Sequence, residues 1–299
     1  MYSELADILP PERIKFGELM KNHTTFKIGG PVDVMLIPQR IEELRKVISY
    51  CRKNGLPFFV LGRGSNLLVR DKGIRSVVIK LGDNLKDVFI SGLEIEAESG
   101  TSLSSLAECA ASHGLTGLEF AEGIPGSFGG AVVMNAGAYG GEIKDIILEV
   151  SALDHSGNIR RYKKQDLSWG YRKSIFQENN HIVVSALIKL KRDDEERIRA
   201  RMSDFAKRRQ DKQPLEYPSA GSTFKRPDGF YVGPMIEELG LKGYTIGGAQ
   251  VSEKHAGFII NIGNATCSDV LELIELIKIK ARERFGVELH PEIRVVGEE

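Results

Sequence analysis

The chain has 299 residues, of which 41% are hydrophobic, and it carries 41 basic and 41 acidic side chains. This length allows about one to three domains and a core that needs no disulfide or metal to hold it. Because the formal net charge is zero, the chain has no long-range field to attract nucleic acid or an anionic membrane. We therefore expect a soluble globular protein that meets any anionic ligand through local contacts.

The cysteines and the amino-terminal residues favour a cytoplasmic protein. Cys51, Cys109 and Cys267 are far apart and form neither CxxC pairs nor the Cys/His spacing of zinc sites, so no metal is predicted. Residues 1–20 carry charges every few positions and contain no apolar run of signal-peptide length. No later segment approaches the length of an apolar membrane span.

A strand, a helix and a second strand are predicted first. Residues 32–38 form a buried apolar run, residues 41–54 carry a helical apolar stripe that ends at Gly55, and residues 57–61 follow as a strand. A glycine loop, residues 62–66, comes directly after that strand. Because ligands favour the carboxyl ends of strands in α/β sheets, this loop is a candidate binding site.

The next segments mix strands and helices without strict alternation, which indicates an α+β domain. In chain order we expect a strand over 73–81, a strand pair turning at Ser91-Gly92, a helix over 103–112, a glycine-rich stretch over 123–141, a hairpin turning at 155–158 and a strand over 181–190.

The carboxyl-terminal part begins with a charged segment. Residues 191–213 hold nine Lys/Arg and six Asp/Glu with almost no apolar stripe, which is typical of a solvated helix or a connector between domains. A domain boundary is expected near 205–215. Ser268 is the expected cap of a helix that runs to Gly286, and the tail over 289–296 is expected to form a final strand.

Two glycine clusters could hold a phosphate. The segment LGRGSNLLV (61–69) lets backbone N–H groups approach an anion closely, although it lacks the dinucleotide fingerprint because Leu67 stands where glycine is needed. Such a loop can also be a simple tight turn. The segment 122–142 is richer in glycine, and its alternative interpretation is a helix packed tightly on a sheet. Together they favour one extended ligand that contains a diphosphate.

Three polar side chains stand out as candidates for chemistry. Arg172 stands with Trp169 and Tyr171 within four residues, beside an apolar Ile-Phe pair, and could clamp a carboxylate or a phosphate. Ser222 follows a glycine in a turn that exposes its hydroxyl, and Glu292 begins a strand after a proline. Lys254 could contact a phosphate, and His255 could be an acid, a base or a structural hydrogen-bonding residue. Taken singly, each could equally be an ordinary surface residue.

The ordered motifs resemble the UDP-N-acetylenolpyruvoylglucosamine reductases, the MurB family, of the shorter type that lacks a tyrosine loop. The motifs are HTTFKIGGP (23–31), LGRGSNLL (61–68), EGIPGSFGGAVVMNAGAYG (122–140), YRKSIF (171–176), AGSTFKRP (220–227), GAQVSEKHAGFIIN (248–261) and HPEIRVVG (290–297). They span nearly the whole chain, and seven motifs in order make coincidence implausible.

This resemblance implies an α+β protein with a two-subdomain FAD-binding fold of the vanillyl-alcohol-oxidase (PCMH) type and a carboxyl-terminal α/β substrate-binding domain. The implied division is residues 1–82 with 288–299 for the first FAD subdomain, 83–210 for the second and 211–287 for the substrate domain. The implied protein is a cytoplasmic enzyme, a monomer by default, whose ligands are small molecules.

The resemblance also implies the reaction. NADPH reduces FAD, and the enolpyruvyl ether of UDP-N-acetylglucosamine then accepts a hydride at its methylene carbon, which yields UDP-N-acetylmuramate for peptidoglycan synthesis. The implied proton donor is Ser222, with Arg172 and Glu292 as its catalytic companions.

The implied ligand contacts form two groups. The implied FAD contacts are Thr25, Gly62, Gly64, Ser65, Asn66, Leu67, Gly123, Ile124, Pro125, Gly126, Gly129, Gly130, Asn135, Gly137 and Ala138. The implied contacts of the substrate or of the nicotinamide cofactor are Tyr171, Lys225, Gln250 and Lys254.

One departure and two alternatives accompany the resemblance. His290 stands where an acidic residue is commoner before the Pro-Glu pair, which could alter the surroundings of Glu292. One alternative is another oxidoreductase on the same FAD scaffold, such as an oxidase of small alcohols. The other is a non-catalytic protein that binds flavin or a UDP-sugar, and the presence of Arg172, Ser222 and Glu292 together argues against it.

Overall fold

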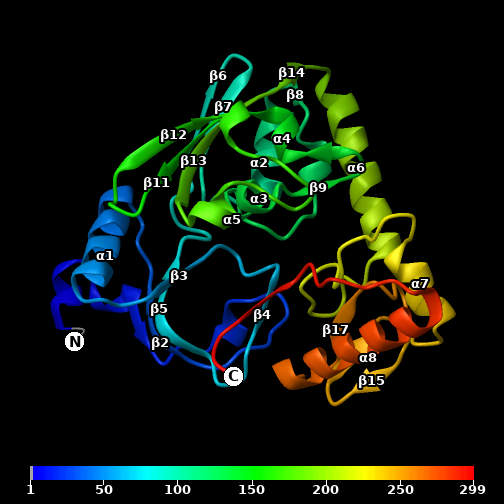
Figure 1. The fold of residues 1–299 in the computed structure, drawn as a ribbon. Coiled ribbons are helices and arrows are strands. Elements are labelled where there is room, and N and C mark those ends of the chain that lie inside the picture. Colours follow the sequence, from blue (N-terminus) through cyan, green and yellow to red (C-terminus); the bar gives the residue numbers. More distant parts are fainter. Residues whose placement is uncertain (1–2) are drawn as a thin grey trace. The chain divides into compact units, whose positions relative to one another are not determined.

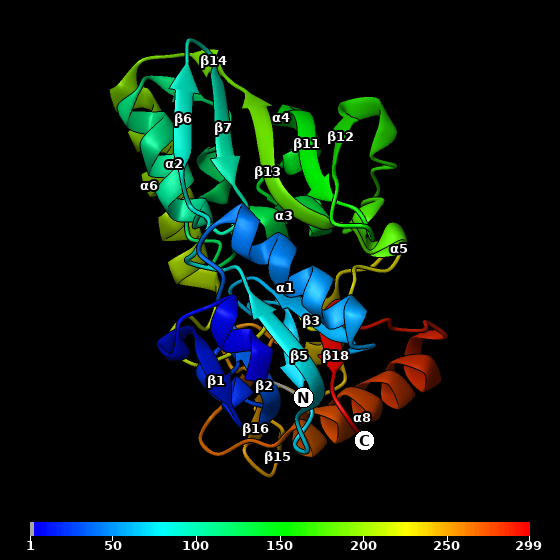
Figure 2. The same ribbon diagram turned by 90° about the vertical axis from the view of Figure 1, so that its left-hand side faces the viewer.

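The computed structural model describes residues 3–299, which group into two compact units. Unit 1 combines the chain up to Phe16 with Val34–Arg63 and Ser76–Arg209, and unit 2 combines Gly17–Asp33, Gly64–Arg75 and Gln210–Glu299. The chain therefore passes between the units several times, and residues that are distant in sequence come together within each unit. Figure 1 and Figure 2 show the ribbon from two directions.

The largest sheet of unit 1 is antiparallel, with the strand order β12-β11-β13-β7-β6. Its strands are β6 (Val88–Ser91), β7 (Glu94–Glu98), β11 (Ile147–Leu153), β12 (Ile159–Lys163) and β13 (Ile182–Lys189). They lie side by side in Figure 2. Both predicted hairpins are confirmed, because β6 pairs with β7 and β11 pairs with β12.

Helices and short ladders complete this part of unit 1. The helices are α2 (Leu103–Ser112), α3 (Phe128–Met134), α4 (Ile143–Ile146), α5 (Phe176–Asn179) and α6 (Glu195–Lys212), with the short helices η4 (Glu119–Ala121) and η5 (Lys164–Asp166). The ladders pair β8 (Leu115–Thr116) with β14 (Lys191–Arg192), and β9 (Gly137–Ala138) with β10 (Gly141–Glu142). In Figure 2, α2 and α3 cover one face of the five-stranded sheet, and α3 contacts β7 and β13.

Helix α2 matches its predicted range, for a local reason. Ser102 accepts a hydrogen bond from the backbone amide of Ser105 and so caps the helix. The apolar face, which includes Leu103 and Leu106, is buried in the core of unit 1. Of the two alternatives for residues 191–213, a helix or a connector, the helix is confirmed over Glu195–Lys212 as α6, which also buries Ile198 against that core, whereas Lys191 and Arg192 form β14.

A second sheet has the strand order β1-β2-β5-β3. Its strands are β1 (Ile14–Phe16), β2 (Val32–Leu36), β3 (Phe58–Leu61) and β5 (Ile74–Lys80), and the nearby helices are η1 (Ser3–Asp7), η2 (Pro11–Arg13) and α1 (Ile41–Lys53). Strand β3 runs parallel to β5, and α1 buries Leu44, Val47 and Ile48 in a core shared with these strands. The predicted strand, helix and strand are thus confirmed.

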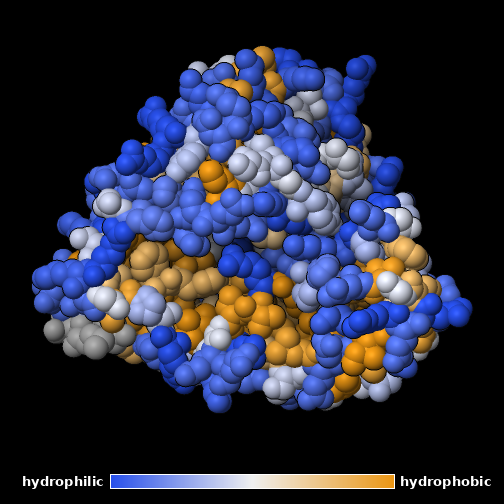
Figure 3. All heavy atoms as spheres, viewed as in Figure 1, coloured by the Kyte–Doolittle hydropathy of each residue, from blue (hydrophilic) through white to orange (hydrophobic). Residues whose placement is uncertain are grey.

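Unit 2 has its own core. Its elements are η3 (Met20–Asn22), β4 (Leu67–Val69), α7 (Val232–Glu238), β15 (Thr245–Ile246), β16 (Ala249–Val251), β17 (Ile259–Asn261), α8 (Cys267–Phe285) and β18 (Arg294–Val296). Strands β15, β16 and β17 form an antiparallel sheet that contacts α8, and the predicted final strand, β18, pairs in parallel with β4. In Figure 3, apolar side chains reach the surface around α7 and α8.

The predicted cap of α8 is wrong by two residues. Thr266 is the cap, because its hydroxyl accepts from the amide of Asp269 while the Asp269 carboxylate accepts from the amide of Thr266. Ser268 lies inside the first turn, where its amide and hydroxyl donate to the carboxylate of Asp71. The predicted end at Gly286 is confirmed, with a left-handed φ of 67°.

The described residues contain no helix that is both long and apolar enough to cross a membrane. They also contain no group of three or more histidine, cysteine or acidic side chains that could hold a metal ion. The three cysteines are free thiols. Burial raises the pKa of Cys51 to about 11 and that of Cys267 to about 12, so both are protonated at neutral pH.

The carboxylate of Asp154 holds the turn between β11 and β12. Its hydrogen bonds predict that the stability of the fold depends on pH. Asp154 accepts from the amides of Asn158 and Ser156 and from Nε of Arg160, at 3.0, 2.8 and 2.9 Å. These bonds lower its pKa from 3.8 to about 2. A carboxylate whose pKa falls on folding stabilises the fold above its unfolded pKa, and this contribution is lost as the pH falls toward the folded pKa.

We therefore expect Asp154→Asn to lower the urea midpoint of unfolding at neutral pH, with a deficit that shrinks once the pH falls below about 4. Urea titrations of both proteins over a pH series measure this difference. A deficit of the same size at every pH would contradict the prediction.

Candidate active site

The first glycine loop follows β3, as predicted, and both of its glycines have close neighbours. A Cβ on Gly62 would lie 2.4 Å from Oγ of Ser127. A Cβ on Gly64 would lie 2.2 Å from the carbonyl oxygen of His23, and Gly64 has a φ of +66°. Because Ser127 belongs to the second glycine stretch, unit 1 brings Gly62 and that stretch into direct contact.

The second glycine stretch contains the start of α3, where the amides already have partners. The amide of Phe128 donates to the carbonyl of Thr101, that of Gly129 donates to Ser99, and that of Gly130 donates to Oγ of the cap, Ser127. A Cβ on Gly129 would lie 2.6 Å from Cβ of Ser99. Tight packing of the helix therefore accounts for Gly129, and a bound diphosphate would need amides other than these three.

Two buried hydroxyl groups lie beside this contact. Oγ of Ser99 and Oγ1 of Thr101 are buried and have no hydrogen-bond partner, and the two residues are only 3% and 4% exposed. A buried polar atom without a partner costs about 1–3 kcal/mol, so each such atom calls for an explanation, such as a bound water, an ion or a functional role. Close glycine backbones and unsatisfied hydroxyl groups fit a phosphate-bearing cofactor such as FAD.

The turn over residues 170–173, here called the arginine turn, has an unusual backbone conformation. Arg172 has a φ of +53°, in the left-handed region that few non-glycine residues adopt. Its Nη2 donates to the carbonyl of Gly137 at 3.2 Å, and its guanidinium lies 5.0 Å from the ring centroid of Tyr171. The side chain of Gln177 donates to the carbonyl of Arg172 at 2.9 Å. Tyr171 is 52% exposed, so its ring is accessible to a ligand.

Three separate motifs converge in unit 2. The amide of Glu292 donates to the carbonyl of Thr223, and the amide of Lys225 donates to the carbonyl of His290, both at 2.8 Å. The segment that follows Ser222 therefore runs beside the segment that carries Glu292. Nδ2 of Asn66, from the first glycine loop, donates to the carbonyl of Glu292 at 3.2 Å. Sequence reasoning predicted these motifs separately but not their contact.

A fourth motif joins them through Thr25. Its amide donates to the carbonyl of Gly64 at 3.3 Å, and its hydroxyl donates to the carbonyl of Ser219 at 2.7 Å. Ser222 itself is exposed and follows Gly221, whose φ is +81°. The glycine allows the sharp turn that presents the serine hydroxyl to solvent.

The candidates on β16 and in the turn after it have local partners. Nε2 of Gln250 donates to Oγ1 of Thr245 at 3.1 Å, and Nζ of Lys254 lies 3.6 Å from the carboxylate of Glu216. Nδ1 of His255 accepts from a backbone amide at 3.0 Å, and burial lowers its pKa. The geometry supports the structural interpretation of His255.

Sequence reasoning missed a buried arginine. Arg209 is 7% exposed, and a Cβ on Gly123 would lie 3.0 Å from its Nε. The guanidinium lies 5.6 Å from the ring centroid of Tyr139, which itself stacks on Phe205. Burial lowers the pKa of Arg209. Its place in a charged helix suggested a solvated side chain, and no pattern in the sequence signals the contact with the glycine stretch.

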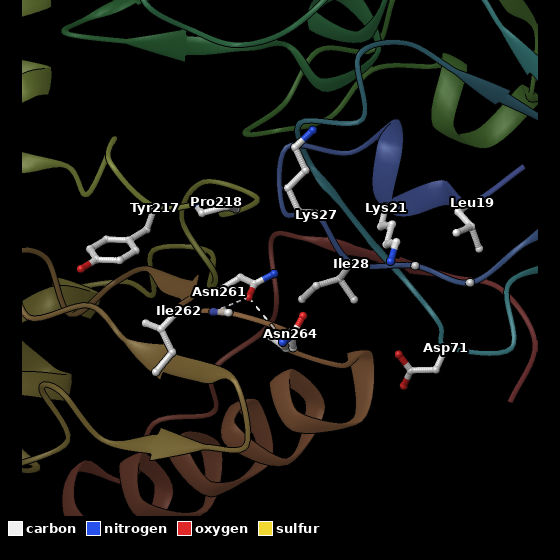
Figure 4. A pocket seen from close by; sticks show the side chains of 14 residues that line it. Leu19, Lys21, Lys27, Ile28, Asp71, Tyr217, Pro218, Asn261, Ile262 and Asn264 are labelled. Atoms are coloured by element: carbon white, nitrogen blue, oxygen red, sulfur yellow. Dashed lines mark hydrogen bonds between the residues drawn. The ribbon is translucent and has the colours of Figure 1, made fainter.

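A cavity of about 600 Å³ lies elsewhere in unit 2. It is lined by Lys21, Lys27 and Asn261 among others, and none of its lining residues is a predicted site residue. Figure 4 shows Asn261 near its centre, with Oδ1 accepting from two backbone amides and Lys27 pointing away. The cavity borders the convergence around Ser222, because Pro218, which lines it, precedes Ser219, whose carbonyl accepts from Thr25.

Two family profiles match the chain. The profile described as UDP-N-acetylenolpyruvoylglucosamine reductase, C-terminal domain, matches residues 213–296, and the profile described as FAD binding domain matches residues 32–163. A UDP-N-acetylenolpyruvoylglucosamine reductase of Syntrophomonas wolfei is 62% identical over 299 residues, which cover 100% of both chains. One of Caldanaerobacter subterraneus is 54% identical over 298 residues, which cover 100% of this chain and 98% of the relative.

Solved structures give the same result for the fold. The crystal structure of UDP-N-acetylenolpyruvylglucosamine reductase (MurB) from Thermus caldophilus has a TM-score of 0.81 and 38% identity, and the match covers 93% of this chain and 97% of that chain. A Phl p 4 variant described as a glucose oxidase has a TM-score of 0.50 and 15% identity over 64% of this chain and 44% of that chain, and it shares the fold alone. The predicted fold class is confirmed.

Proposed function

The chain belongs to the UDP-N-acetylenolpyruvoylglucosamine reductase family, and from this premise we propose that it reduces the enolpyruvyl ether of UDP-N-acetylglucosamine to UDP-N-acetylmuramate. NADPH is the proposed source of electrons. Since full-length relatives carry a reductase name, the chain is an oxidoreductase, and the non-catalytic alternative is set aside. The oxidase alternative would require the reduced protein to react with oxygen as fast as with the UDP-sugar.

The residues around Gly62 and Gly64 would hold FAD. Gly64 lies too close to the backbone of His23 for any side chain, and Gly62 lies against Oγ of Ser127. In unit 1, Ser99 and Thr101 add two buried hydroxyl groups beside the glycine stretch that carries Ser127. When bound and reduced, the flavin supplies the hydride that the methylene carbon accepts. The protein's task is then to bind and orient the substrate and to supply a proton.

Ser222 is the proposed proton donor. Hydride addition to the enol ether develops carbanion character at the carbon next to the carboxylate, and that carbon then takes a proton. A serine hydroxyl is a weak acid, but the carbanion is a much stronger base, so position matters more than a shifted pKa. The exposed turn after Gly221 offers this hydroxyl to a bound ligand.

Arg172 and Glu292 are the proposed companions of Ser222. The guanidinium can pair with the substrate carboxylate and stabilise the charge that spreads onto it as the carbanion forms. Glu292 is fixed to the serine segment through the carbonyl of Thr223, and it would assist in protonating or polarising the developing enolate. The proposed contacts of the substrate or of NADPH are Tyr171, Lys225, Gln250 and Lys254.

One observation carries most weight for this proposal. Within unit 2 the loop of Asn66, the segment after Ser222 and the segment of Glu292 are joined by backbone and side-chain hydrogen bonds. A glycine loop that would hold the cofactor is thus tied to two proposed catalytic residues. Such a connection is expected where a cofactor and a proton donor must meet one substrate.

The domain division and the setting of the enzyme follow as part of the same proposal. We propose that residues 1–82 with 288–299 and residues 83–210 are the two FAD subdomains, and that residues 211–287 bind the substrate. We also propose that the protein is a cytoplasmic monomer that supplies peptidoglycan precursors.

The test is NADPH oxidation by the purified protein with and without the enolpyruvyl ether, with the flavin spectrum recorded in the same cuvette. We expect a yellow protein that consumes NADPH only when the UDP-sugar is present. A flavin spectrum without this turnover would point to another substrate, and a colourless protein that cannot take up FAD would overturn both cofactor and reaction.

A further inference from the structure

We infer that Asn135 and Gln177 are positioning residues, which hold Arg172 in its left-handed backbone conformation and so aim its guanidinium. The inference rests on the proposed role of Arg172. It changes the expected role of Asn135, a predicted FAD contact, and gives a role to Gln177, which the sequence did not single out.

The conformation of Arg172 needs external support. A left-handed backbone is unfavourable for a residue with a side chain, and it persists where the surroundings determine it. Such residues cluster here: four of the nine non-glycine residues with positive φ in the described chain are Asn135, Tyr139, Ser168 and Arg172.

Hydrogen bonds fix the backbone on both sides of Arg172. On the amino-terminal side, Nδ2 of Asn135 donates to the carbonyl of Gly170 at 3.0 Å. Gly170 and Lys173 also exchange backbone hydrogen bonds at 3.1 and 3.2 Å. On the carboxyl-terminal side, Nε2 of Gln177 donates to the carbonyl of Arg172 at 2.9 Å. The arginine therefore sits at the tip of a clamped turn.

The clamp is anchored in the carboxyl-terminal end of α3. Asn135 ends this helix with a φ of +43°, and the carbonyl of Val133 accepts from Oγ of Ser174 at 2.7 Å and from Nε2 of Gln177 at 2.9 Å. Since α3 begins in the second glycine stretch, that stretch and the arginine turn form one connected block. Order in one then favours order in the other.

Asn135 has its side-chain groups engaged inside the protein. Besides Gly170, Nδ2 donates to the carboxylate of Glu142 at 2.8 Å, and Oδ1 accepts from the amide of Lys144 at 3.0 Å. The residue is fully buried. Both N–H donors of the asparagine side chain are therefore used, so a hydrogen bond from Nδ2 to FAD would replace a bond that now holds the turn.

Glu142 places a negative charge near this clamp. The hydrogen bond from Lys144 lowers its pKa, and the Asn135 amide and the charge of Arg172 act in the same direction. The carboxylate is therefore ionised at neutral pH, where it attracts the guanidinium. Together with the carbonyl of Gly137, which accepts from Nη2 of Arg172, it limits the directions that the arginine side chain can take.

Two substitutions test the clamp. Asn135→Asp keeps the shape and tolerance of a left-handed φ but removes the N–H donors. Gln177→Met keeps the length of the side chain but removes its N–H donors. Because this side chain is exposed, the variant should fold, and it tests the positioning role even if Asn135→Asp fails to fold. Each variant should retain FAD and its reduction by NADPH, yet reoxidise its flavin with the UDP-sugar about tenfold or more slowly, because small misplacements of a catalytic group are costly.

A matched control is Asp154→Asn, which removes a carboxylate from another hydrogen-bonded turn of unit 1, the one between β11 and β12. It should lower stability without slowing reoxidation.

A combined variant separates positioning from a general loss of structure: in Gln177→Met with Arg172→Lys, the two rate losses should not multiply. Normal reoxidation in both Asn135→Asp and Gln177→Met, or losses that multiply with Arg172→Lys, would overturn the inference.

The outcomes also separate this inference from the function beneath it. If Arg172→Lys reoxidises at the full rate, the proposed role of Arg172 fails and the positioning role fails with it. If Arg172→Lys is slow while Asn135→Asp and Gln177→Met are both normal, only the positioning role fails.

Discussion

Replacing Ser222 with alanine is expected to leave a yellow protein that NADPH still reduces but that the UDP-sugar barely reoxidises. The hydroxyl is exposed in a turn after Gly221, so its loss creates no core cavity and leaves no buried group without a partner. General acid catalysis typically contributes about 10²–10⁴-fold. We therefore expect a loss of that order in the reoxidation step alone, measured by anaerobic rapid mixing of the reduced protein with substrate.

Two further variants make this result specific. Ser222→Cys keeps an exchangeable proton at the same place and should lie between the wild type and the alanine variant. Ser268→Ala removes another exposed serine hydroxyl of unit 2, one that donates to Asp71, and it should reoxidise normally. Rapid reoxidation of Ser222→Ala would remove Ser222 from the mechanism, whatever the effect on flavin content.

The second large effect is expected for Gly64→Ala, which should release the flavin. The added Cβ would lie 2.2 Å from the carbonyl oxygen of His23, and the φ of +66° is itself unfavourable for alanine. The steric clash and the unfavourable φ both act on this loop, which hydrogen bonds of Thr25 and Asn66 connect to the rest of unit 2. Displacing this backbone should weaken FAD binding by about tenfold or more, since 1.4 kcal/mol corresponds to a factor of ten.

Gly92→Ala is the matched control, because Gly92 has a φ of +63° but open space around its Cβ position. It carries the conformational strain without the clash. FAD content after gel filtration and the dissociation constant from flavin fluorescence compare the two variants. If both lose FAD equally, or both retain it, the close approach at Gly64 does not shape the cofactor site.

Local patterns predicted most of the fold. Helix α2 has its serine cap, its apolar stripe and its terminal glycine within a dozen positions of sequence, so its range was correct. The cap of α8 was misplaced because Thr266 and Ser268 both offer a hydroxyl. The reciprocal bond to Asp269 decides between them, and its Thr-x-x-Asp spacing was present in the sequence.

The site was predictable only in part. The glycine loops and the motifs of Arg172, Ser222 and Glu292 were visible as residue patterns. Their connections were not, since Asn135 meets Gly170 across 35 positions and Asn66 meets Glu292 across 226. No spacing rule predicts such contacts. Arg209 was missed because a charged helix gives no sign of which cation is buried.

The central claim is that the reduced protein delivers its electrons to the enolpyruvyl ether of UDP-N-acetylglucosamine. The most direct test reduces the FAD-loaded protein by light with EDTA as the electron donor, without NADPH, and mixes it anaerobically with that substrate while the flavin absorbance and the product are followed. We predict that the yellow colour returns and that one UDP-N-acetylmuramate forms for each flavin. A flavin that stays reduced with substrate, yet turns yellow in air, would contradict the claim.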